Sequence, residues 1–115
     1  MNIQLSKRHQ DALNYALGQI HTSMIAPYIE DILLFGSCAK GTATEDSDVD
    51  LFLQLREDFP NTREYRTALR LLKSRVTTNN VDEPETDLKI VIGNNWKSSP
   101  MLFYKNVRKE GISLK

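Results

Sequence analysis

Two aspartates one residue apart are the part of the sequence that points most directly to chemistry. Asp48 lies immediately before the stretch Val49–Leu55, and Asp50 lies within it. In this stretch the apolar residues Val49, Leu51, Leu53 and Leu55 alternate with Asp50, Phe52 and Gln54, as in a β-strand with one buried face. Side chains at positions i and i+2 of a strand project from the same face, about 6.6 Å apart. Carboxylates at that spacing can bind or bridge Mg²⁺ ions, and two such ions can hold both the attacking and the leaving oxygen of a phosphoryl transfer.

Asp87 is the candidate for a third carboxylate. It begins a segment in which Leu88 and Ile90 alternate with Asp87 and Lys89, so the acid faces away from the core. If the apolar face of each strand packs on helices, all three acids share the opposite face. The sequence does not establish that the two strands are neighbours, and an ordinary surface residue is the alternative for Asp87. Lys89 either contacts a phosphate or pairs with Asp87 and weakens metal binding.

A Gly-Ser turn precedes the acidic strand. The apolar run Ile32–Phe35 suits a buried strand that ends at Gly36 and Ser37, where a short helix is expected to begin. Backbone N–H groups at a helix start lack partners and suit phosphate, glycine lets the phosphate approach closely, and the serine hydroxyl donates one more hydrogen bond. Together with the acidic strand, this turn predicts a nucleoside triphosphate site.

Calcium binding is the first alternative for the acids. Asp46, Asp48, Asp50 and Glu57 fall at the first, third, fifth and twelfth positions of an EF-hand loop. The sixth position of that loop requires glycine for its sharp turn, but Leu51 stands there and the strand alternation continues. The pattern therefore excludes an EF-hand.

Two other motifs are excluded by what surrounds the Gly-Ser turn. The glycine spacing of Gly36–Gly41 resembles a P-loop, but Thr42-Ala43 follows where lysine and then serine or threonine are required. Ser37 as a hydrolase nucleophile would need a nearby base, and no pattern ties His9 or His21 to it. We interpret both histidines as surface residues or as hydrogen-bonded structural residues.

Three further features have both a structural and a functional interpretation. Trp96 follows the third strand and either stacks on a nucleobase or closes the core or an oligomer contact, with the structural role favoured. Cys38 is most simply a small packed residue. One basic series is interpreted as the solvent-facing side of a helix that could also receive an acidic partner: Arg63, Arg66, Arg70, Lys73 and Arg75.

The elements that must position these residues begin with a helix. Ser6 can cap a helix whose apolar residues recur at three- and four-residue spacing and which ends before Pro27. The two strands described above follow, and Asn61 with Glu64 resembles a capping box that opens a second long helix. The side chains expected to face inward from that helix are Tyr65, Ala68, Leu69, Leu72 and Val76.

The last third of the chain adds a strand and a helix. Asp87–Ile92 alternates as the third strand, Ser99-Pro100 suits a helix entry, and Gly111 suits its exit. The apolar stripe expected on this helix is Leu102, Phe103 and Val107. These elements predict an α/β fold, with a small mixed β-sheet that carries the acids on one face and has helices packed on the other.

Composition limits the size and the class of the protein. The chain has 115 residues, 40% hydrophobic and 26% charged, which fits a single domain over residues 1–115. Lys plus Arg and Asp plus Glu balance at 15 each, which argues against coating nucleic acid or an anionic membrane. No apolar run suits a signal peptide or a membrane span, and the single Cys38 cannot form an internal disulfide. We expect a soluble, cytoplasmic protein.

One motif carries a resemblance to a known family. The segment Gly36–Gly41, followed by Ser47–Leu51, resembles the signature of the DNA polymerase beta-like nucleotidyltransferase superfamily. Within that superfamily, the length and the ending Phe103–Gly111 resemble the minimal, stand-alone nucleotidyltransferases of bacteria and archaea. The resemblance covers nearly the whole chain and implies the nucleotidyltransferase fold. Lys40 stands where arginine is commoner, which keeps the charge but loses a bidentate phosphate contact.

The resemblance also implies roles for individual residues. Those implied to bind the nucleotide are Gly36, Ser37 and Lys40. Those implied to be catalytic and to hold Mg²⁺, as a two-metal site when nucleotide is bound, are Asp48, Asp50 and Asp87. Asp87 would also take the proton from the attacking hydroxyl.

The implied reaction is Mg²⁺-dependent transfer of a nucleoside monophosphate, AMP from ATP, to an acceptor hydroxyl with release of pyrophosphate. Because the chain has the size of a catalytic core alone, the acceptor surface must come from a second copy, as in a homo-oligomer, or from another protein. Minimal members of the family are often paired with a helical HEPN-type protein, so the resemblance implies an antitoxin that adenylylates or masks its partner. The alternatives are a catalytically silent nucleotide-binding module that acts by complex formation, and a transferase for a small hydroxylated molecule.

Overall fold

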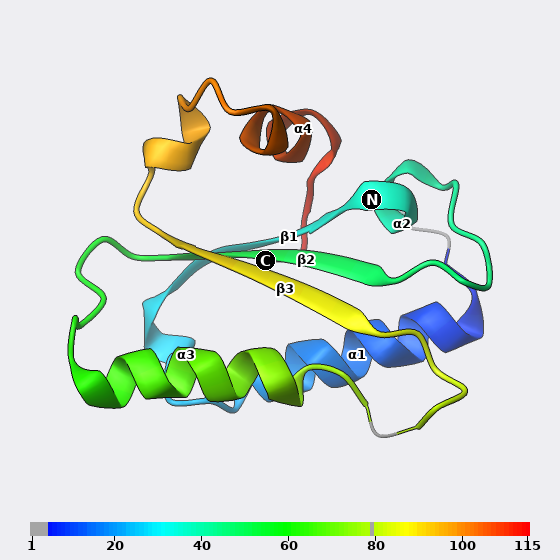
Figure 1. The fold of residues 1–115 in the computed structure, drawn as a ribbon, viewed down its shortest axis with the longest axis horizontal. Coiled ribbons are helices and arrows are strands. Elements are labelled where there is room, and N and C mark those ends of the chain that lie inside the picture. The colour runs from blue at the N-terminus through cyan, green and yellow to red at the C-terminus, as the bar shows by residue number, and fades with distance from the viewer. Residues whose placement is uncertain (1–4, 79) are drawn as a thin grey trace.

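A four-stranded mixed sheet forms the centre of the computed structural model, which describes residues 5–78 and 80–115 (Figure 1). The strand order is β3-β2-β1-β4. The strands are β1 (Ile29–Phe35), β2 (Val49–Leu55), β3 (Thr86–Ile92) and β4 (Ile112–Ser113). The helices are α1 (Lys7–His21), α2 (Gly36–Lys40), α3 (Arg63–Arg75) and α4 (Leu102–Glu110), with single 3₁₀ turns η1 (Ala26–Tyr28) and η2 (Asn95–Lys97). The predicted mixed α/β sheet is confirmed.

The connections explain the mixed directions of the strands. β1 pairs antiparallel with both β2 and β4, whereas β2 and β3 are parallel. Parallel neighbours need a crossover, and α3 supplies it. The parallel register places Asp50 directly beside Asp87, and the antiparallel register places Phe35 beside Asp50 on the other side.

The main core lies between the sheet and the layer of α1 and α3 below it in Figure 1. Val49, Leu51, Leu53 and Leu55 are fully buried against the apolar stripe of α1, as their alternation predicts. The inward set predicted for α3 is also confirmed: Leu72 and Val76 are buried, and Tyr65, Ala68 and Leu69 pack against the same cluster.

A smaller second layer covers part of the opposite face of the sheet. Phe52 is fully buried there, with Leu33, Trp96 and Val107 around it and α4 above the sheet in Figure 1. Helices therefore pack on both faces of the sheet, whereas the sequence predicted them on one face. The difference arises because Phe52 projects from the same face as the acids, and its apolar side chain must be covered. The structural interpretation of Trp96 is confirmed, since its ring centroid lies 4.8 Å from that of Phe52.

Several element boundaries differ from the sequence prediction. The N-cap of α3 is Thr62, whose side chain accepts the Tyr65 N–H at 3.3 Å. The capping box predicted at Asn61 is therefore wrong by one residue, because Asn61 Oδ1 instead accepts a hydrogen bond from Arg66 at 2.8 Å. Leu102, expected in the apolar stripe of α4, is 72% exposed at the first turn of that helix.

The strands also begin earlier than predicted, β1 at Ile29 and β3 at Thr86, because polar residues at their ends continue the ladders. Within the described parts of the chain, no helix has the length and apolar character needed to cross a membrane.

Candidate functional site

The parallel pairing of β2 and β3 brings two of the predicted acids together. Asp50 and Asp87 are register partners, and their side chains share the face that is opposite to the main core. Asp48 is exposed immediately before β2, Asp50 is half-buried, and Asp87 is exposed at the start of β3. The structure thus establishes the adjacency of the two acidic strands, which the sequence left open, and the functional roles of the three acids stay predictions.

The electrostatics of Asp50 show that this cluster holds excess negative charge. Partial burial raises the pKa of Asp50 above its ordinary value, and the charges of Asp87 and Asp48 raise it further, while Lys89 lowers it. Removing water and adding like charges both disfavour the ionised form of a carboxyl. A cation placed among these acids would relieve the repulsion.

Lys89 supplies the positive charge closest to the acids. Its Nζ lies 3.8 Å from Oδ2 of Asp87, and both side chains are about half exposed. Of the two roles predicted for Lys89, the structure contains the ion pair with Asp87. Exposed pairs of this kind contribute little stability, typically about 0–1 kcal/mol. The lysine can therefore move away from Asp87 at little cost when another cation or a phosphate is present.

Gly36 packs directly against Asp50. The backbone at Gly36 has φ of +73°, a left-handed conformation that side chains disfavour. A Cβ atom at this position would lie 2.5 Å from Oδ2 of Asp50, closer than real Cβ contacts allow. Only glycine therefore fits between the end of β1 and the acid, which places the turn predicted to bind triphosphate directly beside the predicted metal ligands.

The predicted nucleotide contacts follow in the short helix α2. Ser37 is half-buried in its first turn, where helical N–H groups have no partner within the helix. Lys40 lies at the other end of α2, and its Nζ is 3.7 Å from Oε1 of Glu110 on α4. Gly41, with φ of +74°, ends the helix. Binding of nucleotide by these residues stays a prediction, and Lys40 would have to leave Glu110 to reach a phosphate.

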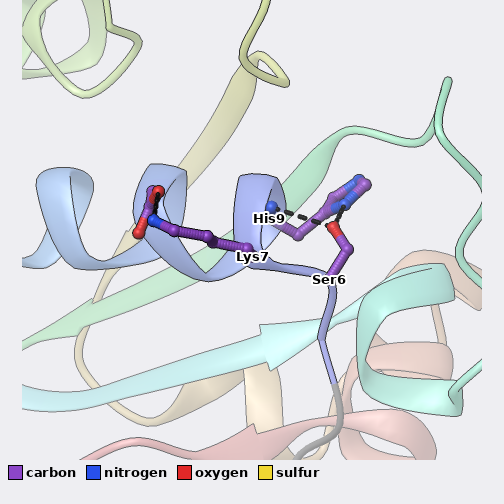
Figure 2. A network of polar contacts seen from close by, with 4 residues as sticks. Ser6, Lys7 and His9 are labelled. Carbon is purple, nitrogen blue, oxygen red and sulfur yellow. Dashed lines mark hydrogen bonds and ion pairs between the residues drawn. The ribbon is translucent and has the colours of Figure 1, made fainter.

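A buried histidine, His9, bonds to Ser6 at the start of its own helix (Figure 2) and also to the loop that leads into the acids. His9 is 2% exposed, and its Nε2 lies 2.8 Å from the carbonyl oxygen of Ser47, the residue before Asp48. A carbonyl only accepts, so Nε2 carries the proton and donates it. Nδ1 then accepts from the Ser6 hydroxyl at 2.6 Å, and that hydroxyl in turn accepts the His9 backbone N–H at 3.2 Å.

This contact confirms the interpretation of His9 as a hydrogen-bonded structural residue. No local sequence signal indicates that its partner is Ser47, because the two residues are 38 positions apart. On the other side of the acids, the thiol of Cys38 donates to the carbonyl oxygen of Asp48 at 3.4 Å. Cys38 is buried in the main core, which confirms its interpretation as a small packed residue, and burial, followed by the nearby charges of Asp50 and Asp48, raises the pKa of its thiol.

The donor set at this site consists of carboxylate oxygens, the ligand type that Mg²⁺ prefers. Asp50 and Asp87 are the pair that the fold places side by side, and Asp48 is close enough to perturb Asp50. Within residues 5–78 and 80–115, no three histidine, cysteine or acidic side chains are grouped tightly enough to form a metal site by themselves. The residues fit a Mg²⁺ ion whose remaining ligands come from substrate phosphates and water, and the three-carboxylate site stays a prediction.

Comparison with known proteins agrees with this geometry. Residues 19–111 match the family described as "Nucleotidyltransferase domain". One relative is a Methanocaldococcus jannaschii protein, MJ0604, whose name proposes that it is a protein adenylyltransferase. It is 39% identical to this chain over 83 residues, which cover 72% of this chain and 75% of the relative. A crystal structure of a toxin-antitoxin with AMP-PNP superposes with a TM-score of 0.52 at 22% identity, covering 89% of this chain and 71% of that one, and this likeness concerns the fold alone.

The family match covers most of the chain, and it includes the Gly-Ser turn, the acidic strand and Asp87. The expectation of a nucleotidyltransferase that the sequence motif raised is therefore confirmed. The chain belongs to the nucleotidyltransferase domain family.

Proposed function

We propose that this protein transfers AMP from ATP to a hydroxyl group of a partner protein in the cytoplasm, with Mg²⁺ as cofactor. The observation that carries the proposal is the placement of Asp50 beside Asp87 and against Gly36, because it puts two carboxylates next to the turn that suits a triphosphate. The proposed activity in the name of the archaeal relative, protein adenylyltransferase, supports AMP and a protein acceptor.

In this proposal some residues of the site bind the nucleotide and the metal, and one of them also accepts a proton. Gly36 and Ser37 hold the triphosphate through backbone N–H groups and the serine hydroxyl, and Lys40 adds a charge. Asp48, Asp50 and Asp87 hold Mg²⁺, which when bound neutralises the charge that develops on the phosphates.

The proposed reaction is a single in-line displacement. The acceptor oxygen attacks the α-phosphorus, the bond from that phosphorus to the bridging oxygen breaks, and pyrophosphate leaves with the electron pair. Asp87 accepts the proton of the attacking hydroxyl.

The partner is proposed to be a helical HEPN-type protein for which this chain acts as antitoxin. The solved toxin-antitoxin that resembles this fold contains AMP-PNP, which supports a nucleotide-dependent pair of this type. A second candidate is a catalytically silent module that binds its partner without modifying it. The Lys89–Asp87 ion pair favours that candidate, because a lysine that stayed on Asp87 would occupy the oxygen needed for metal or proton.

The test combines nucleotide binding and label transfer. Purified protein is titrated with Mg²⁺–ATP by calorimetry, and transfer of a labelled α-phosphate is then followed with the co-encoded helical protein as acceptor. We expect saturable binding and label on the partner, both lost in the Asp48→Ala/Asp50→Ala double variant. Asp46→Ala is the matched control, since Asp46 is an exposed acid of the same loop.

Four outcomes separate the candidates. Label on the partner supports the transferase, and stable association without label supports the silent module. Absence of Mg²⁺–ATP binding, or binding that survives in the double variant, would refute the proposed transferase. Label that appears only on added small hydroxylated compounds would replace the protein acceptor by a small one.

A further inference from the structure

The outer edge of β3 carries backbone groups that no strand within residues 5–78 and 80–115 pairs. β3 is the last strand of the sheet and borders β2 alone. The Val49 N–H donates to the Glu85 carbonyl and the Gly93 N–H donates to the Leu55 carbonyl, both at 2.9 Å, so the odd-numbered residues of this strand bond toward β2. The even-numbered residues therefore direct their N–H and C=O groups outward: Leu88, Ile90 and Ile92.

One residue at the beginning of this edge confirms the direction of these groups. The Thr86 N–H donates to the Thr77 hydroxyl at 3.2 Å, and the same hydroxyl donates to the Thr86 carbonyl at 3.1 Å. Thr77 thus occupies the place that a next strand would take. Beyond Thr86, no side chain or loop among the described residues bonds the outward groups of Leu88, Ile90 or Ile92.

A groove of about 360 Å³ runs along this edge. The groove is lined by Lys89, Ile90 and Val91 of β3, Phe52 of β2, Lys73 of α3, and Phe103 and Tyr104 of α4. In Figure 1 the β3 arrow runs between α3 below it and α4 above it.

The charges of the groove select what can bind there. Lys73 and Lys89 both line it, and among the described residues no acidic side chain does. Asp87, two residues before Lys89, already has that lysine as a partner. Lysines on an exposed edge also discourage pairing between copies of a protein, because like charges would meet. The same lysines attract a strand of opposite charge.

We propose that the edge of β3 binds an extended acidic segment of the acceptor protein as an added strand, next to the site of AMP transfer. This inference rests on the proposed function and names how its protein substrate is held. Backbone hydrogen bonds to Ile90 and Ile92, which are partly exposed, supply affinity without regard to side chains, and the two lysines supply the preference for acidic residues.

The position of this edge connects binding to chemistry. Asp87 and Lys89 belong to the strand that forms the groove, and they lie on the face that also carries Asp50. Neighbouring strands lie about 4.8 Å apart, and alternate side chains of an added strand would project onto that same face. Every second residue of the bound segment is therefore directed toward the acids.

The test uses short synthetic peptides that carry one hydroxyl residue flanked by glutamates, or by lysines in a matched set. Transfer of label from α-labelled ATP is measured at several peptide concentrations. Each peptide is then remade with a single N-methyl group at successive positions. A strand that pairs along one edge uses the N–H of every second residue, so loss of transfer should alternate along the peptide. Removing one backbone hydrogen bond of about 1 kcal/mol predicts roughly fivefold loss of transfer at sensitive positions.

Variants of the edge give an independent measurement. Ile90→Pro removes an outward N–H without breaking the ladder to β2, and Ile90→Ala removes the same side-chain contacts while it keeps that N–H. We expect the KM for glutamate-flanked peptides to rise at least about tenfold in Ile90→Pro relative to Ile90→Ala, a factor equal to about 1.4 kcal/mol. Lys73→Glu should reverse the preference toward lysine-flanked peptides, whereas Lys109→Glu, outside the groove, should not.

Two results would overturn the proposal while the proposed function stands. One is Mg²⁺–ATP binding together with no label on any peptide. The other is label whose N-methyl sensitivity lacks alternation. Since the peptide scan uses the unaltered protein, it decides the question even if Ile90→Pro does not fold. Absence of Mg²⁺–ATP binding is a separate outcome, which refutes the proposed function and, because the inference rests on it, the proposal too.

Discussion

Replacing Gly36 by alanine should damage the protein through two separable effects. The first is conformational, because a non-glycine residue at φ of +73° costs about 1–2 kcal/mol. The second is steric, because the new Cβ would lie 2.5 Å from Oδ2 and 3.3 Å from Cγ of Asp50. Overpacking of this kind typically costs about 1–3 kcal/mol. We therefore expect Gly36→Ala to lower the free energy of unfolding by about 2–5 kcal/mol.

Gly41 provides the matched control for the conformational effect. Its φ of +74° is nearly the same, but a Cβ atom there meets nothing within 4 Å. Gly41→Ala should lose only about 1–2 kcal/mol. Urea unfolding followed by circular dichroism measures both variants, and the difference between them is the cost of the contact with Asp50.

A double-mutant cycle assigns that difference to the carboxylate. In the Asp50→Ala background, Oδ2 and Cγ are gone and the remaining Cβ of residue 50 lies 3.5 Å from the new methyl group, an ordinary contact. Gly36→Ala should then cost about as little as Gly41→Ala, about 1–2 kcal/mol. Equal losses for Gly36→Ala and Gly41→Ala in the unaltered protein, or a Gly36→Ala cost that Asp50→Ala leaves unchanged, would refute the close approach of turn and acid.

Two further predictions concern the acid cluster and its support. Because the folded-state pKa of Asp50 is raised, ionised Asp50 opposes folding, and this loss of stability grows as pH rises from the ordinary carboxyl value through the folded pKa. Asp50→Asn should therefore raise the melting temperature of metal-free protein at pH 7, but should leave the melting temperature unchanged at a pH below the ordinary carboxyl pKa. An equal rise in melting temperature at both pH values would contradict this reasoning. His9→Ala removes two buried hydrogen bonds, leaves the Ser47 carbonyl unpaired and should destabilise by about 2–4 kcal/mol. The exposed His21→Ala should change stability by less than about 0.5 kcal/mol, and equal effects would argue against the structural role of His9.

Much of the site could be predicted because its components are local. The alternation from Val49 to Leu55 places Asp50 opposite to the core side chains, and this phase depends only on the two-residue period of a strand. The Gly-Ser turn between an apolar run and the acidic strand is likewise a short-range pattern. Within a window of about ten residues, backbone sterics and burial leave few alternatives.

Other features depend on partners that are remote in the chain. The predicted single helical layer misses α4, because only the assembled sheet shows that Phe52 must be covered by Trp96 and Val107. The start of α3 is a separate, local case. The predicted cap at Asn61 misses Thr62 by one residue, because these adjacent polar side chains compete for the same N–H groups and the exact chain path selects one. The anchor from His9 to Ser47 has no sequence signature at all.

The sequence by itself determined the chemistry that this protein can offer: carboxylates of the right phase, a turn suited to phosphate and a family motif that names the reaction class. The tertiary structure decided which of those groups meet. Asp50 and Asp87 became neighbours because α3 returns the chain for a parallel pairing that buries the apolar faces of both strands. The open edge of β3 exists for the same reason, since the order of strands follows from burying the whole sheet and is not contained in any one segment.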